Sequence, residues 1–177
     1  TIELYAVEEQ SYFEFNNLLA DDDIVAFIDS KFEGKKELTE PALLQLSMPV
    51  IHGLVDRLLG GTGEDDPVSE GASITEIELA LYETLLNRMI PVMNDVWESY
   101  VVSEFTYSRI ETNPRLIQAI SMDEIVLVVS FEVTLNGMEG MLNLCLPSAI
   151  LDYIFSRIEE TARLLSRKKE SQSKEEM

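Results

Sequence analysis

DIVAFIDSKF at residues 23–32 and EIVLVVSFEV at residues 124–133 begin two copies of the same pattern. The first copy continues through ALLQLSMPVIHGLVDRL (42–58) and the second through GMLNLCLPSAILDYIFSRI (140–158). Each copy predicts the same order of elements: a strand, a hairpin turn that contains glycine, a second strand, a proline and a helix. A constant offset of 98 residues aligns Leu44, Leu46 and Pro49 of the first copy with Leu142, Leu144 and Pro147 of the second. The repeat predicts an α/β domain with pseudo-twofold symmetry, in which hairpin strands form one sheet and helices cover it.

Helix and turn signals define the elements around the two hairpins. Aromatic and leucine residues at helical spacing predict a short helix within residues 9–20. Gly34 is expected in the first hairpin turn, and Pro49 is expected to end the second strand before a helix over residues 50–59. In the second copy, Asn136-Gly137 favours a two-residue turn, because both turn positions prefer positive φ.

The longest helix is predicted between the two copies. Ser73 and Glu76 fit a capping box, since the serine hydroxyl can accept a hydrogen bond from the third helical amide while the glutamate reaches back. Apolar residues continue to Tyr100 on two neighbouring stripes, so we expect this helix to pack on two sides. Pro91 removes one backbone donor and is expected to kink the helix, and a polar loop is expected over residues 110–115.

The end of the chain is charged and poor in apolar residues. A last helix is predicted over residues 148–160, and residues 161–177 are expected to form a charged tail or linker, either helical or frayed. We therefore expect one domain over residues 1–160. Because the chain opens at Thr1 inside an apolar–polar alternation, without an initiator methionine, we expect it to be a piece of a longer protein, truncated at its N-terminus.

Composition limits the class of partner. The chain has 177 residues, 46% of them hydrophobic, which is enough for one well-buried domain. Thirteen Lys and Arg against 33 Asp and Glu give a net charge of −20, which argues against nucleic acid and anionic lipid as partners because both are bound through basic residues. No apolar stretch is long enough to insert into a membrane, and a single cysteine, Cys145, excludes an internal disulfide.

A glycine-rich stretch, LLGGTGEDD (58–66), follows the helix predicted over residues 50–59. It does not fit a phosphate-binding loop, which needs a lysine after the last glycine, because Glu64, Asp65 and Asp66 stand there and would repel phosphate. Two interpretations remain open. Gly60 or Gly61 can end the helix in the left-handed conformation, although a helix end explains three glycines less well than one. Alternatively, a loop with few side chains lets the backbone of another protein approach closely.

Other candidate sites favour structural interpretations, and we expect neither a cofactor, a metal nor a catalytic site. His52 is the only histidine and has no second histidine or cysteine near it in sequence. Cys145 lies between two leucines of a predicted strand, which favours a buried structural thiol. The acidic run 21–23 lacks the spaced ligands of a calcium loop and favours a turn.

Several segments resemble the middle domain of the flagellar motor switch protein family FliM. They cover most of residues 1–160 in order, and the RIETNP run and the glycine loop before the long helix are the strongest markers. The matching segments are SYFEFNNLL (11–19), LVDRLLGGTGE (54–64), SITEIELALYETLLNRMIPVMNDVWESY (73–100), RIETNPRLIQAISMDEIVLVVSFEV (109–133) and GMEGMLNLCLP (137–147).

The resemblance implies a CheC-like α/β fold, in agreement with the repeat. It implies a place in the cytoplasmic ring at the base of the flagellar motor, on the inner face of the cell membrane. It also implies side-by-side packing of copies through the helical layer, and binding to the middle domain of FliG through a Gly-Gly-Pro-Gly loop. That loop matches Gly60, Gly61, Thr62 and Gly63, where Thr62 departs from the proline, and the expected flanking contacts are Asp56, Arg57 and Glu64.

The resemblance also limits what this chain can do alone. The parts of the family that bind FliN and phosphorylated CheY are expected to lie outside it. On the same basis, replacing Gly61 by aspartate is expected to weaken FliG binding through steric clash and added charge while leaving the fold intact. The expected function is therefore a non-enzymatic assembly module that supports switching of rotation in chemotaxis.

The alternative is a phosphatase of phosphorylated CheY, since CheC-, CheX- and FliY-like proteins share the expected fold. Their active helix carries a glutamate and an asparagine three residues apart, which position a water molecule for attack. Here Thr84 precedes Asn87 at that spacing and Pro91 precedes Asn94, and the helix over 148–160 contains no asparagine. The alternative is therefore disfavoured.

Overall fold

The computed structural model describes residues 1–33, 40–63 and 73–175, the last three by their backbone alone. The expected turn at Gly34 and the acidic stretch that begins at Glu64 lie outside the described residues. One sheet of six antiparallel strands forms the centre of the domain, in the order β1-β5-β6-β3-β2-β4. Its strands are β1 (Ile2–Ser11), β2 (Val25–Phe32), β3 (Ala42–Leu46), β4 (Ser103–Glu111), β5 (Ile125–Leu135) and β6 (Met138–Pro147).

The sheet has the predicted pseudo-twofold symmetry. The equivalent strands β3 and β6 meet at its centre, where Gln45 faces Asn143, and β2 and β5 flank them. The outer strands β1 and β4 each carry one unpaired bulge residue, Tyr5 in β1 and Ser108 in β4. The predicted turn at Asn136-Gly137 is confirmed, with φ values of 48° and 84°.

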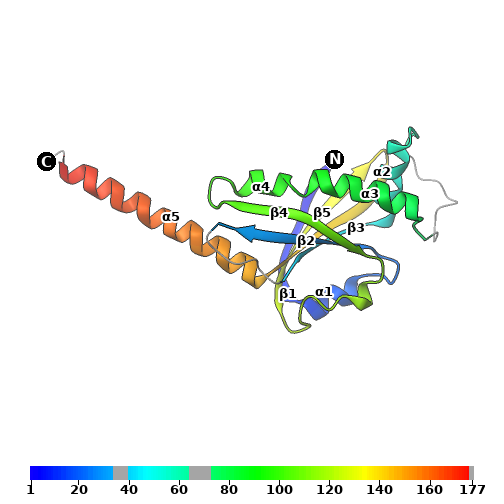
Figure 1. The fold of residues 1–177 in the computed structure, drawn as a ribbon, viewed down its shortest axis with the longest axis horizontal. Coiled ribbons are helices and arrows are strands. Elements are labelled where there is room, and N and C mark those ends of the chain that lie inside the picture. Colours follow the sequence, from blue (N-terminus) through cyan, green and yellow to red (C-terminus); the bar gives the residue numbers. More distant parts are fainter. Residues whose placement is uncertain (34–39, 64–72, 176–177) are drawn as a thin grey trace.

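Helices cover the two faces of the sheet unequally (Figure 1). One face, which we call the helical face, packs against α2 (Met48–Leu58), α3 (Glu76–Met89), α4 (Val92–Trp97) and the first turns of α5 (Ser148–Glu175). The other face packs against α1 (Tyr12–Leu18) and the short 3-10 helix η2 (Pro114–Leu116). Strand β2 alternates between the two cores: Ala26 and Ile28 pack on the helical face, and Val25 and Phe27 on the α1 face.

Arg115, the residue after RIETNP, joins α1 to η2. Its guanidinium donates from Nη1 to the carbonyl oxygen and Oδ1 of Asn16, at 2.6 and 3.0 Å, and from Nη2 to the carbonyl oxygen of Leu19 at 2.8 Å. Its Nε also donates to Asp21, 3.1 Å away. Carbonyl groups at the end of a helix have no partner within the helix, so this one side chain satisfies the end of α1 and fixes the turn after it.

Several predicted boundaries were wrong. Strand β4 was not predicted, and its last two residues were expected in a polar loop. The capping box of α3 uses Thr75 and Glu78 in place of Ser73 and Glu76. Pro91 separates α3 from α4, so that the predicted kink is a break.

Two further differences concern the chain around the prolines and at its end. Pro49 lies in the first turn of α2, whereas Pro147 ends β6, so these two residues are not structurally equivalent. Helix α5 continues to Glu175, well beyond residue 160, and its second half projects away from the sheet (Figure 1). None of the described helices is long and apolar enough to cross a membrane.

Candidate protein-binding site

The glycine loop begins as the C-terminal cap of α2. The amide of Gly60 donates to the carbonyl oxygen of Arg57 at 3.1 Å, and that of Gly61 donates to the carbonyl oxygen of Asp56 at 2.8 Å. With Gly60 at φ 91°, this is the paired hydrogen-bond pattern of a Schellman motif. The helix-cap interpretation of Gly60 is therefore confirmed.

The loop then folds back onto the last turn of α2. The amide of Gly63 donates to Oδ2 of Asp56 at 2.8 Å, and Nη1 of Arg57 donates to the carbonyl oxygen of Thr62 at 3.1 Å. That carbonyl oxygen also accepts a hydrogen bond from Nδ2 of Asn136, in the β5–β6 turn. The structure thus brings Asp56 and Arg57 into contact with the loop and anchors the loop to a second element of the fold.

The loop's own geometry requires the other two glycines. A Cβ atom at Gly61 would lie 2.1 Å from Oδ2 of Asp56, the atom that receives the Gly63 amide. Gly63 has a φ of 70°, and a Cβ atom there would lie 2.5 Å from Cγ of Arg57. The conformation of the loop therefore requires glycine at each of these positions. Hydrogen bonds hold the loop backbone in that one conformation.

This loop and the end of α2 form an exposed patch. Gly60, Gly61 and Thr62 are exposed, as are the side chains of Asp56 and Arg57, while Gly63 is buried. Leu58 and Leu59 add apolar surface, with 46% and 66% of each residue exposed. We call residues 56–63 the loop patch. The predicted contact Glu64 lies outside the described residues.

Sequence reasoning missed three contributors to this patch. Leu58 and Leu59 lie at the end of a helical pattern, and the sequence analysis treated both only as helix residues. Their exposure could not be predicted, because it depends on how α2 packs. Asn136 was identified only as a turn residue, although an asparagine at a hairpin turn can hydrogen-bond a neighbouring loop. No pattern along the chain indicates that contact, because the two loops are 74 residues apart.

His52 and Glu78 join α2 to the start of α3. Nδ1 of His52 lies 3.2 Å from Oε1 of Glu78, and the other carboxylate oxygen of Glu78 accepts the amide of Thr75 at 2.8 Å. The pKa of Glu78 is lowered, and the largest cause is the hydrogen bond from the Thr75 amide. The Thr75 hydroxyl and His52 lower it further. This contact fixes the start of α3 against the helix that carries the loop patch.

Replacing Glu78 by alanine is expected to lower the free energy of unfolding by about 1 kcal/mol at pH 7, because the capping box and the His52 contact are lost. A carboxyl with a lowered folded-state pKa stabilises the fold above its ordinary value of 4.5, and this stabilisation is lost as pH falls through the folded pKa. The difference between the wild type and this variant in urea unfolding should therefore shrink below pH 4.5. Glu76→Ala, in the same helical turn, is the control, and an equal loss there would contradict the account.

The remaining sequence candidates have structural roles. Cys145 is fully buried, and burial raises the pKa of its thiol to about 12. Asp23 accepts the amide of Ala20 at 2.8 Å, which confirms the turn. Oδ1 of Asn94 accepts the amide of Phe105 at 2.7 Å, and Nδ2 of Asn87 donates to a backbone carbonyl. Among the residues that the structure describes, no cluster of side chains could hold a metal ion.

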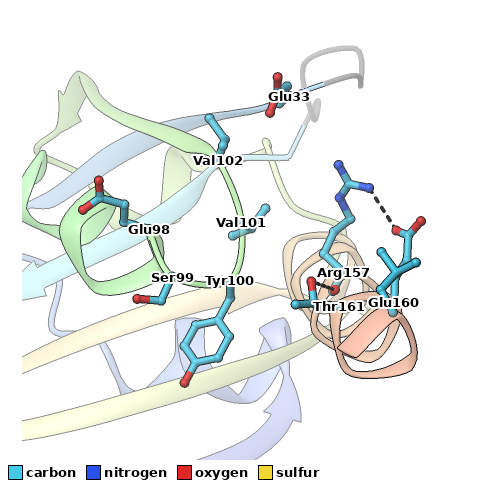
Figure 2. Close-up of a pocket in the computed structure, with 10 residues that line it drawn as sticks. Glu33, Glu98, Ser99, Tyr100, Val101, Val102, Arg157, Glu160 and Thr161 are labelled. Carbon is cyan, nitrogen blue, oxygen red and sulfur yellow. Dashed lines mark hydrogen bonds and ion pairs between the residues drawn. The ribbon is translucent and has the colours of Figure 1, made fainter. Parts of the chain in front are cut away.

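Apart from the loop patch, a concave region lies between the chain after α4 and the middle of α5 (Figure 2). Its volume is about 280 Å³, and Arg157 within it donates to Glu160 at 2.9 Å. Its ten lining residues include no histidine, cysteine or asparagine. The lining therefore lacks the asparagine that the phosphatase alternative pairs with a glutamate. The lining residues are Glu33, Glu98, Ser99, Tyr100, Val101, Val102, Arg157, Glu160, Thr161 and Leu164.

Comparisons with known proteins identify a family. Residues 1–162 match the family model of flagellar motor switch protein FliM. The FliM protein of Borreliella burgdorferi is 27% identical over 89% of this chain and 43% of its own length, and that of Thermotoga maritima is 24% identical over 93% and 48%. The chain therefore spans about half the length of the curated relatives it matches. The names of these relatives describe a structural component of the motor, which agrees with the prediction that the chain is not an enzyme.

Solved structures give the same fold. The FliM middle domain from H. pylori matches 88% of this chain and 80% of its own, with a TM-score of 0.72 and 24% identity. A chain of a FliG–FliM complex from H. pylori matches 82% of this chain over 76% of its own length, with a TM-score of 0.71 and 25% identity. FliY from Thermotoga maritima shares the fold, with a TM-score of 0.74 and 15% identity. The match covers 90% of this chain and 81% of FliY. The CheC-like fold predicted from the sequence is confirmed.

Proposed function

Because this chain belongs to the FliM family of flagellar motor switch proteins, we propose that it is a non-enzymatic assembly module of the motor switch. Its partner is the middle domain of FliG, bound at the loop patch of residues 56–63. A related chain of known structure, 25% identical, is part of a FliG–FliM complex, which supports FliG as the partner.

The observation that carries this proposal is the fixed, side-chain-poor backbone of residues 60–63. Hydrogen bonds to Asp56, Arg57 and Asn136 hold the loop before any partner arrives, so little conformational entropy is lost on binding. Gly60 and Gly61 allow close backbone approach, and Leu58 and Leu59 supply apolar contact beside them. The patch is small, which fits a modest interface that can rearrange when the motor switches.

We infer that copies of the module also pack side by side through α3 and α4. Large apolar side chains are exposed along these helices and just after them: Met89 in α3, Val92 and Val96 in α4, and Tyr100. In the longer protein, we expect FliN and phosphorylated CheY to bind parts outside this chain. We place the assembly in the cytoplasmic ring at the base of the flagellar motor, with residues 161–177 as a charged tail or linker after the domain of residues 1–160.

Replacing Leu59 by aspartate is expected to weaken FliG binding by about 10- to 100-fold, the equivalent of losing one buried leucine from an interface. Leu59 is 66% exposed in the free chain, so the fold should not change. The measurement is a calorimetric titration with purified FliG middle domain. Leu116→Asp is the matched control, because Leu116 is 63% exposed in η2, on the other face of the sheet. Equal affinities for both variants would place the FliG contact elsewhere.

A further inference from the structure

Asn136, which the sequence identified only as a turn residue, has a backbone conformation that glycine adopts more easily. Its φ is 48°, and it is the one residue other than glycine with a positive φ in the part of the chain that the structure describes. Asparagine tolerates this region better than most residues, but glycine has no Cβ atom and adopts it at lower cost. The turn alone would therefore accept glycine at position 136, so an asparagine there needs a further physical reason.

The side chain of Asn136 supplies that reason. It is exposed at the β5–β6 turn and donates from Nδ2 to the carbonyl oxygen of Thr62, in the loop patch. The same carbonyl oxygen accepts a hydrogen bond from Nη1 of Arg57 at 3.1 Å. One carbonyl group thus receives two donors, which matches its two lone pairs. Arg57 belongs to α2 itself, so Asn136 is the donor that ties the loop to the sheet.

A second contact from the same turn lies beneath the loop. Met138 is 5% exposed, and its side chain packs against Gly53 in α2, where an added Cβ atom would lie 1.9 Å from Cε of Met138. The carbonyl oxygen of Gly63 would lie 3.4 Å from the same Cβ atom. The β5–β6 turn is therefore packed on α2 directly below the loop patch, and this packing sets the position from which Asn136 reaches Thr62.

The repeat shows that the fold itself does not require this arrangement. The helix equivalent to α2 in the second half is α5, which contains no glycine and continues without a break to Glu175. The glycine loop is thus a feature of one half only, built where α2 ends at Leu58. A loop that the fold does not require, held by donors from two elements, has the preorganisation that favours binding.

We propose that Asn136 is a positioning residue for the loop patch: its amide holds the Thr62 carbonyl group, and with it residues 60–63, in the conformation that FliG binds. This inference rests on the proposed function, because it concerns the same site. It gives Asn136 a role in affinity that is separate from its role in the turn. The turn needs only a residue that adopts a positive φ, whereas the loop needs the side-chain amide.

Replacing Asn136 by glycine separates the two roles. Glycine adopts the positive φ at lower cost, which offsets the lost hydrogen bond, so the midpoint of urea unfolding should not fall. FliG affinity, measured by calorimetric titration, should fall by about three- to tenfold, the equivalent of one hydrogen bond. In the free chain, the amides of residues 60–63 should exchange with deuterium faster than in the wild type, because the loop opens more often.

Asn113→Gly is the matched control, since it makes the same change in a cap on the other face of the sheet. Oδ1 of Asn113 accepts the amide of Arg115 at 3.0 Å, and its φ of −127° gives glycine no advantage. This variant should show the opposite pattern, with a lower unfolding midpoint and wild-type FliG affinity. Asn136→Asp is a second test, because aspartate also tolerates the turn but presents an acceptor to the Thr62 carbonyl oxygen. Its FliG affinity should fall at least as far as that of Asn136→Gly.

The measurements distinguish failure of this inference from failure of the proposed function. Either wild-type FliG affinity or wild-type exchange of residues 60–63 in Asn136→Gly would overturn the role of Asn136. A loss of affinity accompanied by a lower unfolding midpoint would also overturn it, since the residue would then act only through the fold. Absence of FliG binding by the wild type would instead refute the proposed function. The exchange comparison, made without FliG, would still decide whether Asn136 holds the loop.

Discussion

Replacing Gly61 by aspartate is expected to abolish measurable FliG binding, with a loss of at least about 100-fold in affinity. A Cβ atom at this position would lie 2.1 Å from Oδ2 of Asp56, so that carboxylate must rotate away and release the Gly63 amide. The second carboxylate adds like charge beside the first. The loop then loses both its fixed conformation and its close approach to a partner.

This mechanism differs from the one that the sequence suggests, which is clash with the partner over an unchanged fold. The structure predicts a local change in the free protein as well, with stability lowered by about 1–2 kcal/mol through the lost hydrogen bond and the crowded pair of carboxylates. Calorimetric titration and urea unfolding measure the two effects. Leu116→Asp is a suitable control, since it adds the same charge at a position that is 63% exposed in η2, on the other face of the sheet. Full FliG affinity in the Gly61→Asp protein would contradict the account.

Replacing Arg115 by alanine is expected to lower the free energy of unfolding by about 2–3 kcal/mol, the largest stability effect outside the apolar cores. The side chain supplies three hydrogen bonds to Asn16 and Leu19 at the end of α1, and its loss leaves their carbonyl groups without that donor. Lysine should restore less than half of the stability, because one ammonium group cannot reproduce the planar geometry of the guanidinium.

Urea unfolding followed by circular dichroism measures this effect. Arg167→Ala is the control, since Arg167 is exposed on the projecting part of α5 and the change should fall within about 0.5 kcal/mol of wild type. FliG affinity of the Arg115→Ala protein should stay unchanged while it is folded, because Arg115 lies on the other face of the sheet from α2. Wild-type stability in this variant would show that α1 needs no such anchor.

Local signals predicted the centre of the fold well. The Asn136-Gly137 turn and the apolar runs around it define β5 and β6, and the repeat predicted both the symmetry and the helix after each hairpin. Strand β4 was missed because it is an outer strand that comes after a long helical pattern. Its apolar residues, Phe105 and Tyr107, gain their burial from α3 and α4, and this packing is not visible in a short sequence window.

The sequence identified the glycine loop as the candidate site, and its binding of FliG stays a prediction. The hydrogen bonds that hold the loop could not be predicted. Three glycines after a helix indicated an unusual loop, and the family resemblance indicated its partner. The role of Asp56 as acceptor for the Gly63 amide depends on the loop folding back onto the helix, and the role of Asn136 depends on two distant turns meeting. Neither contact has a sequence signal, because both result from the three-dimensional path of the chain.

The most direct test of the central claim is hydrogen–deuterium exchange of this chain with and without saturating FliG middle domain. The account predicts slower exchange at the amides of residues 58–63 in the complex and unchanged exchange at η2 and along α1. Protection confined to α3, α4 or the projecting part of α5, with residues 58–63 unaffected, would contradict it and leave the glycine loop as a helix end with no part in binding FliG.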